Sequence, residues 1–418
     1  MNHILILDIG KTNKKAFVFD EDYQIVHETS IQLPETTDDD GDPCEDIALL
    51  QDWILETTAT LLHHPDFQIR AINCTTYGAS FVHLGEDMQP LTPLYNYLKP
   101  FPPDLLDWFL KKYGGQKKLC LETASPLLGH LNSGLQLLWL KHHKSLIFNK
   151  IKYSLHLPQW VSLLFEGSIC SEMTSLGCHT MLWDFQKKDY HEWVKAERLS
   201  EKFPPFKAGT RHPKYHIGTG LHDSSAALIP YLSSFREPFV LISTGTWCIS
   251  LNPFNHEPLT AGELAQDCLC YLTFVGKTVK AARYFGGNEH EQAVKRIANE
   301  CGVPTDFYKK EKSNGGGGTK LQTALKAYDD FMQELVKKQA ASTRLAIGHS
   351  PVRRIFVDGG FSKNERYMRL LASASPEMEI FAAEVAQATA LGAAMAMHRA
   401  WNEKPLPTNL IGCKHVNT

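Results

Sequence analysis

The chain lacks any run of about 18 consecutive apolar residues, so its 418 residues contain no candidate for a membrane-spanning helix. Its N-terminus also lacks a basic segment followed by an apolar stretch and a small-residue cleavage site, which argues against a secretory signal. A large charge of one sign is missing as well, because the formal net charge is only −3. We therefore expect neither nucleic acid nor a membrane as a partner.

The ten cysteines do not show the regular spacing of a disulfide scaffold. We therefore expect reduced thiols and a cytoplasmic protein. A metal enzyme built on Cys268 and Cys270, or on Cys178 and His179, is disfavoured because neither pair has the spacing of a zinc site. The hydrophobic fraction of 43% and the charged fraction of 21% are typical of globular proteins, and the length predicts two or three domains.

The stretch ILILDIGKTNKKAFVFD, which starts at Ile4, contains GKT and raises the question of a P-loop. A P-loop needs a glycine five residues before its GK[ST] and a helix directly after it. Leu5 stands where that glycine is needed, and the residues after Thr12 have the β-branched and aromatic pattern of a strand. The sequence therefore predicts a β-hairpin, with Asp8 at the end of its first strand.

Such a hairpin can still hold a nucleotide. Gly10 would let backbone N–H groups approach an anion, and the Thr12 hydroxyl can donate a hydrogen bond. The Asp8 carboxylate can face Mg²⁺ through water. An ordinary hairpin with a polar turn explains the same residues, and this stretch alone favours that simpler interpretation.

The N-terminal third predicts an antiparallel meander of three strands between Ile4 and Leu33, followed by a solvated acidic loop over 35–46. A calcium loop is disfavoured there because the glycine is not where that pattern needs it. Apolar spacing and turn residues then predict a strand from Ile69. Helices are predicted over 46–64, 133–143, 157–167 and 189–199, with a mostly irregular segment over 171–185.

A second hairpin is predicted from Phe239 to Pro253, where FVLISTGTWCISLNP repeats the order of strand, polar turn and strand. Two such hairpins, each opening a set of strands and helices, indicate two similar domains facing each other across a cleft. Two unrelated hairpins explain the pattern equally well. Beyond it we expect a glycine-rich linker over 314–320, helices over 321–342, 365–375 and 386–400, and a strand that ends at Gly359.

Asp223 follows a glycine-rich turn in GTGLHDSSAAL and precedes good helix formers. Its residue type and position suit a helix N-cap. They also suit a general base that accepts a proton from a substrate hydroxyl as a phosphoryl group arrives. The local sequence favours the cap.

Five segments resemble the FGGY carbohydrate kinases, which belong to the superfamily of actin, hexokinase and heat-shock chaperones: DIGKTNKKAFVFD, GLHDSSAA, STGTW, VDGGFSKN and ATALGAAMA. Their order and separations match over nearly the whole chain. The resemblance implies an α/β fold of two actin-like (ribonuclease H-like) domains facing each other across a nucleotide and sugar cleft. We expect residues 1–235 to form the sugar-binding domain with the first phosphate hairpin, and residues 236–418 to form the nucleotide-binding domain.

The resemblance also implies individual roles. Asp8 matches the acid that holds the Mg²⁺ of MgATP, and Asp223 matches the catalytic base, which reverses the local preference for a cap. The nucleotide-binding positions are Gly10, Thr12, Asn13, Thr244, Gly245, Thr246, Gly359, Gly360 and Asn364. The sugar-binding positions are Thr76, Tyr77, Gly78 and His222.

The sequence departs from the family pattern in three places. Lys11 and Phe361 stand where small residues are usual, which bears on nucleotide preference, and the chain is shortened between Phe254 and Asn314. The segments around Gly78 and His222 look closer to rhamnulokinase-like members than to glycerol kinases.

The expected function is ATP-dependent phosphorylation of a small ketose, deoxyketose or polyol. The alternatives are a catalytically silent sugar or nucleotide sensor of the same fold and a chaperone-like or filament-forming ATPase, although no peptide-binding domain follows the second nucleotide segment. A homodimer is compatible with the sequence, which does not fix the oligomeric state.

Overall fold

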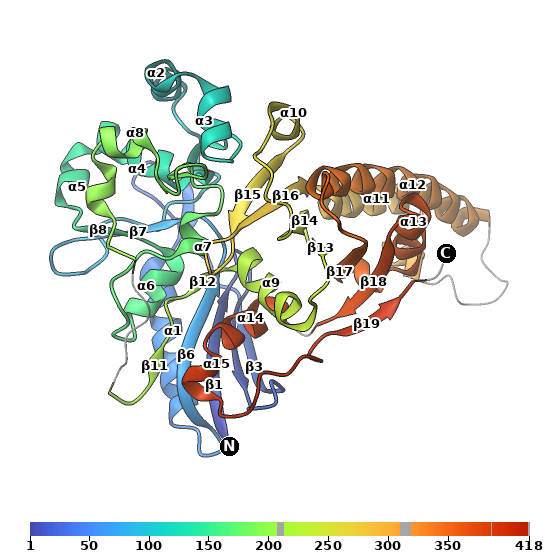
Figure 1. Ribbon diagram of the computed structural model, residues 1–418, viewed down its shortest axis with the longest axis horizontal. Helices are drawn as coiled ribbons and strands as arrows, with labels where there is room; N and C mark the ends of the chain where they lie inside the picture. Colours follow the sequence, from blue (N-terminus) through green and yellow to red (C-terminus); the bar gives the residue numbers. More distant parts are fainter. Residues whose placement is uncertain (207–212, 310–318, 386, 417–418) are drawn as a thin grey trace.

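The computed structural model describes residues 1–206, 213–309, 319–385 and 387–416 (Figure 1). Two mixed β-sheets with flanking helices form its two halves. Most of the predicted glycine-rich linker, residues 314–318, lies outside the described residues. Among the helices that the structure describes, none has the length and apolar character needed to cross a membrane.

The first sheet has the strand order β11-β6-β1-β2-β3, with β12 also paired to β6. The strands β1, β2 and β3 form the predicted antiparallel meander, whereas β6, β11 and β12 run parallel to one another and to β1. Their bounds are β1 (Asn2–Ile9), β2 (Lys14–Phe19), β3 (Ile25–Ile31), β6 (Gln68–Thr76), β11 (His216–Ile217) and β12 (Leu221–His222). The C-terminal ends of β1, β6 and β12 therefore meet at one edge of this sheet.

The second sheet has the order β15-β16-β14-β13-β17-β18-β19. Here β13 is antiparallel to β14 and parallel to β17, which repeats the relation of β1 to β2 and β6 and confirms the predicted repetition of the hairpin. The bounds are β13 (Phe239–Thr244), β14 (Cys248–Asn252), β15 (Cys268–Leu272), β16 (Thr278–Tyr284), β17 (Arg354–Gly359), β18 (Glu379–Glu384) and β19 (Gly412–His415).

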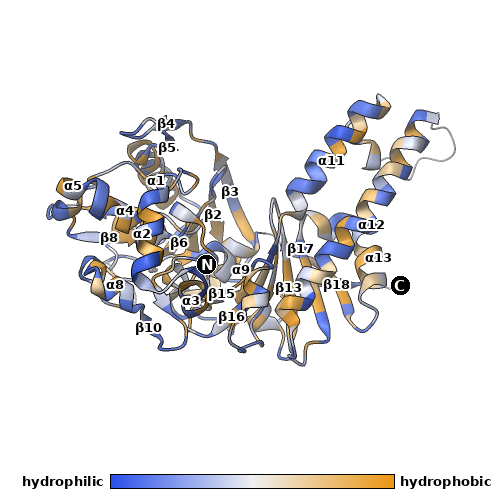
Figure 2. Ribbon diagram, turned by 90° about the horizontal axis from the view of Figure 1, so that it is seen from above, coloured by the Kyte–Doolittle hydropathy of each residue, from blue (hydrophilic) through white to orange (hydrophobic). Residues whose placement is uncertain are grey.

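The central strands of both sheets are apolar and buried. Ile4 to Leu7 of β1 and Phe239 to Ile242 of β13 are fully buried, as expected for central strands covered on both faces. Figure 2 shows this concentration of hydrophobic residues in the strands of the second sheet and the hydrophilic outer faces of α11 (Gly286–Cys301) and α12 (Thr319–Ile347).

Small residues allow the helices α9 (Asp223–Ser234) and α14 (Ala388–Ala396) to pack closely near the centre of the molecule (Figure 1). A Cβ atom on Gly392 would lie only 1.9 Å from the Ala226 carbonyl oxygen. This contact leaves no room for a side chain at position 392, so the two helices pack backbone against backbone there. It also places α14 against β1 of the first sheet, although α14 follows the second sheet in the chain.

The other predicted helices are largely confirmed as α1 (Ile47–Leu62), α4 (Ser133–His143) and α13 (Glu365–Ala374). The helices predicted over 157–167 and 189–199 are shorter, since α6 ends at Leu163 and α8 spans only Glu192–Ala196 after a short strand. The further elements are α2 (Pro103–Tyr113), α3 (Gln116–Glu122), α5 (Ser145–Lys150), α6 (Leu157–Leu163), α7 (Met173–Leu176), α10 (Ala261–Leu264), α15 (His398–Trp401), β4 (Glu35–Thr37), β5 (Pro43–Glu45), β7 (Phe81–Leu84), β8 (Tyr153–His156), β9 (Trp183–Asp184) and β10 (Asp189–Tyr190).

The acidic segment 35–46 is not the solvated loop that the sequence predicts. Its ends pair as the β4–β5 hairpin, and its acidic tip surrounds the buried ammonium group of Lys99. Lys99 Nζ lies 2.6 Å from a carboxylate oxygen of Asp38, 2.6 Å from one of Asp42 and 2.9 Å from one of Asp40. A lysine thus occupies the centre of the acidic cluster, and it lowers the pKa of Asp38 despite the burial of that carboxyl.

Replacement of Lys99 with Met is expected to lower the free energy of unfolding by about 3 kcal/mol, because the buried charge of Asp38 would lose its cationic partner and keep only backbone N–H donors. Urea unfolding at neutral pH measures this loss. The matched control is Lys152→Met, which removes the exposed pair with Glu86 and should cost less than about 1 kcal/mol. Equal losses in the two variants would contradict the assignment.

Candidate functional site

The edge of the first sheet brings together the two acids singled out from the sequence. Asp8 pairs with Thr75 across β1 and β6, and His222 pairs with Thr76 across β12 and β6. Asp223 follows His222 directly and begins α9. The two acids are therefore neighbours in space although they lie 215 positions apart in the sequence (223 − 8 = 215).

The pKa of Asp8 is raised to about 6, mainly by burial and in smaller part by the negative charge of Asp223. A hydrogen bond from the Thr389 hydroxyl to Asp8 Oδ2, 3.0 Å long, and the charge of Lys15 act in the opposite direction. A carboxyl group that is costly to ionise and lies near a second carboxylate fits a site for a divalent cation, which would favour both charges.

Asp223 is not the N-cap of its helix, so that interpretation is wrong. The cap position belongs to His222, whose side chain makes no capping hydrogen bond, and Asp223 is the first helical residue. Asp223 Oδ1 accepts the Ser224 backbone N–H at 2.5 Å and lies 3.2 Å from His222 Nε2. About a third of the Asp223 side chain, 35%, is exposed, so the carboxylate is held on one side and open on the other.

The predicted sugar-binding positions lie beside Asp223. A Cβ atom on Gly78 would lie 2.6 Å from His222 Cδ2, so glycine gives the imidazole its space. The backbone N–H of His222 donates to Thr174 Oγ1 at 2.9 Å. Burial lowers the pKa of the His222 imidazole. The Thr76 hydroxyl donates to the Tyr77 carbonyl, and the Tyr77 hydroxyl donates to the Glu45 carboxylate.

The first hairpin turn is closed by the Gly10 N–H, which donates to the Asn13 carbonyl at 2.9 Å. Gln32 Nε2 donates to Asn13 Oδ1 at 2.9 Å, so the side-chain oxygen of Asn13 already has a partner within the protein. Thr12 is exposed in the turn.

The second hairpin lies against the end of β17. A Cβ atom on Gly359, where φ is +86°, would lie 2.1 Å from the Thr244 carbonyl oxygen, and one on Gly287 would lie 1.8 Å from the Gly245 carbonyl oxygen. Thr244 Oγ1 accepts the Phe361 N–H at 3.0 Å, and the Thr246 carbonyl accepts the Asn288 N–H at 3.1 Å. Only glycine permits this convergence of bare backbone.

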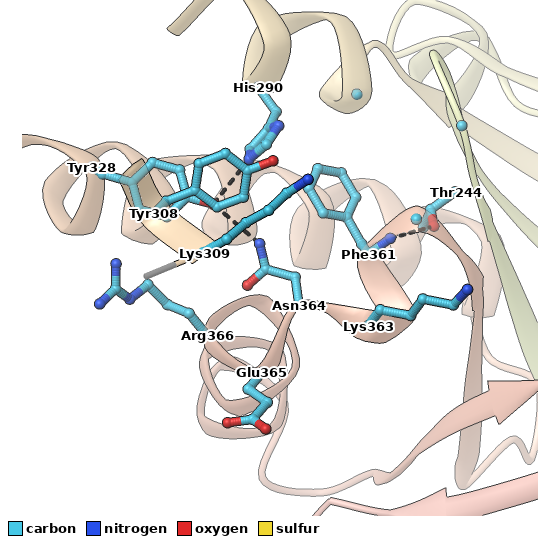
Figure 3. A pocket seen from close by; sticks show the side chains of 13 residues that line it. Thr244, His290, Tyr308, Lys309, Tyr328, Phe361, Lys363, Asn364, Glu365 and Arg366 are labelled. Atoms are coloured by element: carbon cyan, nitrogen blue, oxygen red, sulfur yellow. Dashed lines mark hydrogen bonds between the residues drawn. The ribbon is translucent and has the colours of Figure 1, made fainter. Parts of the chain in front are cut away.

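A cavity of about 760 Å³ opens beside this second hairpin (Figure 3). It is lined by the predicted Thr244, Gly245, Gly360 and Asn364. Gly359, Thr246 and the first hairpin are not among its lining residues, so the structure brings the predicted nucleotide positions together only in part.

Several further lining residues were not predicted from the sequence, among them His290, Tyr308 and Tyr328. The Tyr308 and Tyr328 rings stack with centroids 5.0 Å apart, and the Tyr328 hydroxyl lies 2.9 Å from His290 Nε2. Asn364 Nδ2 donates to that hydroxyl at 3.0 Å, as Figure 3 shows. Phe361 is buried and stacks on Tyr367, which orients it as part of the cavity wall.

The cysteines give no support to a metal enzyme. Cys178, Cys268 and Cys270 are buried free thiols. In the part of the chain that the structure describes, the one group of three clustered potential metal ligands is Asp38–Asp40, where Lys99 already binds.

Comparison with known proteins identifies the family of both halves of the chain. The model of the N-terminal domain of the FGGY family of carbohydrate kinases matches residues 3–208. Two models of FGGY C-terminal domains match residues 236–313 and 321–401.

Two curated relatives are rhamnulokinases. The protein from Halalkalibacterium halodurans is 26% identical over 268 residues, which cover 60% of this chain and 56% of the relative. The protein from Bacteroides thetaiotaomicron is 24% identical over 205 residues, covering 45% of this chain and 42% of the relative. The chain thus spans about half the length of the curated relatives it matches.

Solved structures share the fold. A carbohydrate kinase from Novosphingobium aromaticivorans has a TM-score of 0.79 at 21% identity, covering 100% of this chain and 94% of that one. The glycerol kinase of Plasmodium falciparum with ADP has a TM-score of 0.75 at 17% identity, covering 96% and 90%. The predicted fold of two actin-like α/β domains is confirmed, and the chain belongs to the FGGY family of carbohydrate kinases.

Proposed function

We propose that the protein transfers a phosphoryl group from ATP to a hydroxyl group of a small sugar, with Asp223 as the general base. The observation that carries this proposal is the juxtaposition of Asp8 and Asp223 at one sheet edge, beside Gly78 and His222. A carboxylate that is about one-third exposed and lies next to the proposed cation site has the chemistry needed to accept a hydroxyl proton.

The nucleotide is assigned to the cavity beside the second hairpin. Thr244, Gly245 and Gly360 line the cavity and offer the backbone access that phosphates need, while Gly359 packs against Thr244 and Thr246 belongs to the same hairpin tip. The adenine ring of the nucleotide would lie near Asn364 and the Tyr308–Tyr328 pair. The glycerol kinase of similar fold was solved with ADP, which supports a nucleotide as a ligand of this fold.

The first hairpin, with Gly10, Thr12 and Asn13, is assigned to the transferred end of the nucleotide. Asp8 would hold Mg²⁺, which supplies neutralisation of phosphate charge when it is bound. The raised pKa of Asp8 fits this role because it reports an anion that lacks a sufficient partner in the protein.

The sugar is assigned to the sheet edge formed by Thr76, Tyr77, Gly78 and His222. The curated relatives are named rhamnulokinases, which supports a ketose of that kind as the acceptor. We assign sugar binding to residues 1–235 and nucleotide binding to residues 236–418, with closure of the two halves excluding water from the reacting groups.

The direct test is ADP formation from MgATP in the presence of rhamnulose, fuculose, xylulose, ribulose or glycerol. We expect one ketose to increase the rate by about 100-fold or more over the rate without sugar, because the sugar hydroxyl replaces water as the acceptor. Calorimetric binding of ADP is the control. Binding of ADP without stimulation by any sugar would support the sensor alternative instead.

A further inference from the structure

The β4–β5 hairpin forms ion pairs with two lysines at the first phosphate turn, Lys11 and Lys14, and the two pairs differ in burial. Its paired residues Glu35 and Glu45 contact Lys11 and Lys14, respectively. Lys14 is buried, its ammonium group forms an ion pair with the Glu45 carboxylate, and it donates a hydrogen bond to the Lys11 carbonyl at 2.9 Å. A buried pair of this kind is costly to break, so it fixes the backbone of the turn.

Lys11 has a much looser partner. Its Nζ lies 3.0 Å from Glu35 Oε1, but 23% of the Lys11 side chain and 49% of the Glu35 side chain are exposed. An exposed ion pair contributes only about 0–1 kcal/mol, so a more highly charged anion can displace Glu35 at little cost.

The position of Lys11 points to the reacting end of the site. It lies between Gly10 and Thr12 in the turn, and its Nζ is 6.0 Å from the centroid of the Tyr77 ring. Tyr77 adjoins Gly78, which touches His222 next to Asp223. The ammonium group therefore lies between the phosphate turn and the proposed sugar segment.

We propose that Lys11 exchanges Glu35 for the γ-phosphate of ATP and stabilises this group while it is transferred. This inference rests on the proposed function. In the transfer step the P–O bond to ADP breaks as the bond to the sugar oxygen forms, and the hydroxyl proton passes to Asp223. A lysine suits the task because its ammonium group is a compact charge with three donors.

The resemblance to the FGGY carbohydrate kinases implies a small residue at this position, so Lys11 is a departure from the expected pattern. The Lys11–Glu35 pair is also unnecessary for holding the β4–β5 hairpin, which Glu45, Tyr77 and Lys99 already anchor. Glu35 then serves to keep Lys11 near the turn until the nucleotide arrives.

The test compares Lys11→Met with Glu35→Gln, since both variants remove the same ion pair but only the first removes the cation. Calorimetry gives the Kd of each protein for ADP and for the ATP analogue AMP-PNP, both with Mg²⁺. We expect Lys11→Met to weaken AMP-PNP about tenfold relative to ADP. Glu35→Gln should leave that ratio unchanged or favour AMP-PNP.

Kinetics supply the second readout. With the sugar found in the panel, Lys11→Met should lower kcat by about 30-fold, leave the KM for sugar unchanged, and be partly rescued by Lys11→Arg. Equal effects of Lys11→Met and Glu35→Gln, equal weakening of ADP and AMP-PNP, or a change confined to the KM for sugar would overturn the proposal. If no sugar stimulates turnover, the proposed function fails, but the AMP-PNP to ADP ratio still decides the role of Lys11.

Discussion

Replacement of Asp223 with Asn is expected to lower kcat by about 10³-fold while ADP binding stays within about twofold of the wild-type value. Asparagine has the same shape and can still accept the Ser224 N–H through its carbonyl oxygen, so α9 should begin as before. It cannot accept a proton from the sugar hydroxyl. Steady-state kinetics with the sugar identified in the panel, together with calorimetry for ADP, measure both quantities.

The matched control is Ser224→Ala, which removes the hydroxyl that donates to Asp223 Oδ1 at 3.2 Å and leaves the backbone donor in place. This variant should lose about tenfold or less in kcat, far less than Asp223→Asn, because it removes one long hydrogen bond to the carboxylate while the shorter bond from the Ser224 N–H remains. A kcat for Asp223→Asn within tenfold of wild type would show that another group accepts the proton, and the neighbouring His222 would be the next residue to test.

The sequence predicts the elements of this site better than it predicts their contacts. The hairpins at Asp8 and Thr244 follow from local alternation of apolar residues and from turn residues, and both are confirmed. The residues that surround each hairpin are set by parallel strand pairing, of β1 with β6 for the first and of β13 with β17 for the second. Each pairing joins segments that are far apart in the chain. Such pairings leave no local periodicity to detect.

The acidic hairpin illustrates the same limit. A run of aspartates ordinarily indicates a solvated loop, and nothing within 35–46 signals the lysine that enters the cluster from position 99. The Tyr308–Tyr328 stack was missed for a related reason. Tyr328 has the spacing of a buried residue in an amphipathic helix, and its cavity-facing hydroxyl becomes evident only once His290 and Asn364 are placed beside it.

Replacement of Asp8 with Asn is expected to stabilise the metal-free protein and to inactivate it. Burial and the charge of Asp223 raise the pKa of Asp8 from an ordinary value of about 4 to about 6, so ionised Asp8 costs up to about 3 kcal/mol in the folded state. Asparagine removes that cost. It should also lower kcat/KM for MgATP by about 10³-fold, because the proposed ligand of the divalent cation is lost.

The pH dependence separates this explanation from a general change in packing. The folded state holds the Asp8 proton more tightly than the unfolded state, so ionisation reduces wild-type stability as the pH rises from about 4 to about 6. The advantage of Asp8→Asn should therefore be absent below pH 4, grow through this interval and stay constant above it. The exposed Asp22→Asn, which loses a pair with Lys404, serves as the control and should change the free energy of unfolding little.

Addition of Mg²⁺ and ADP should then reverse the order of the two proteins. A ligand that binds only the folded state stabilises it in proportion to its affinity, so the wild-type Tm should rise well above that of Asp8→Asn at pH 7.5. Thermal unfolding with and without Mg²⁺ measures this reversal. An advantage of Asp8→Asn that is the same at pH 4 and pH 7.5, or that Mg²⁺ leaves unchanged, would place the cation elsewhere and leave Asp8 a purely structural acid.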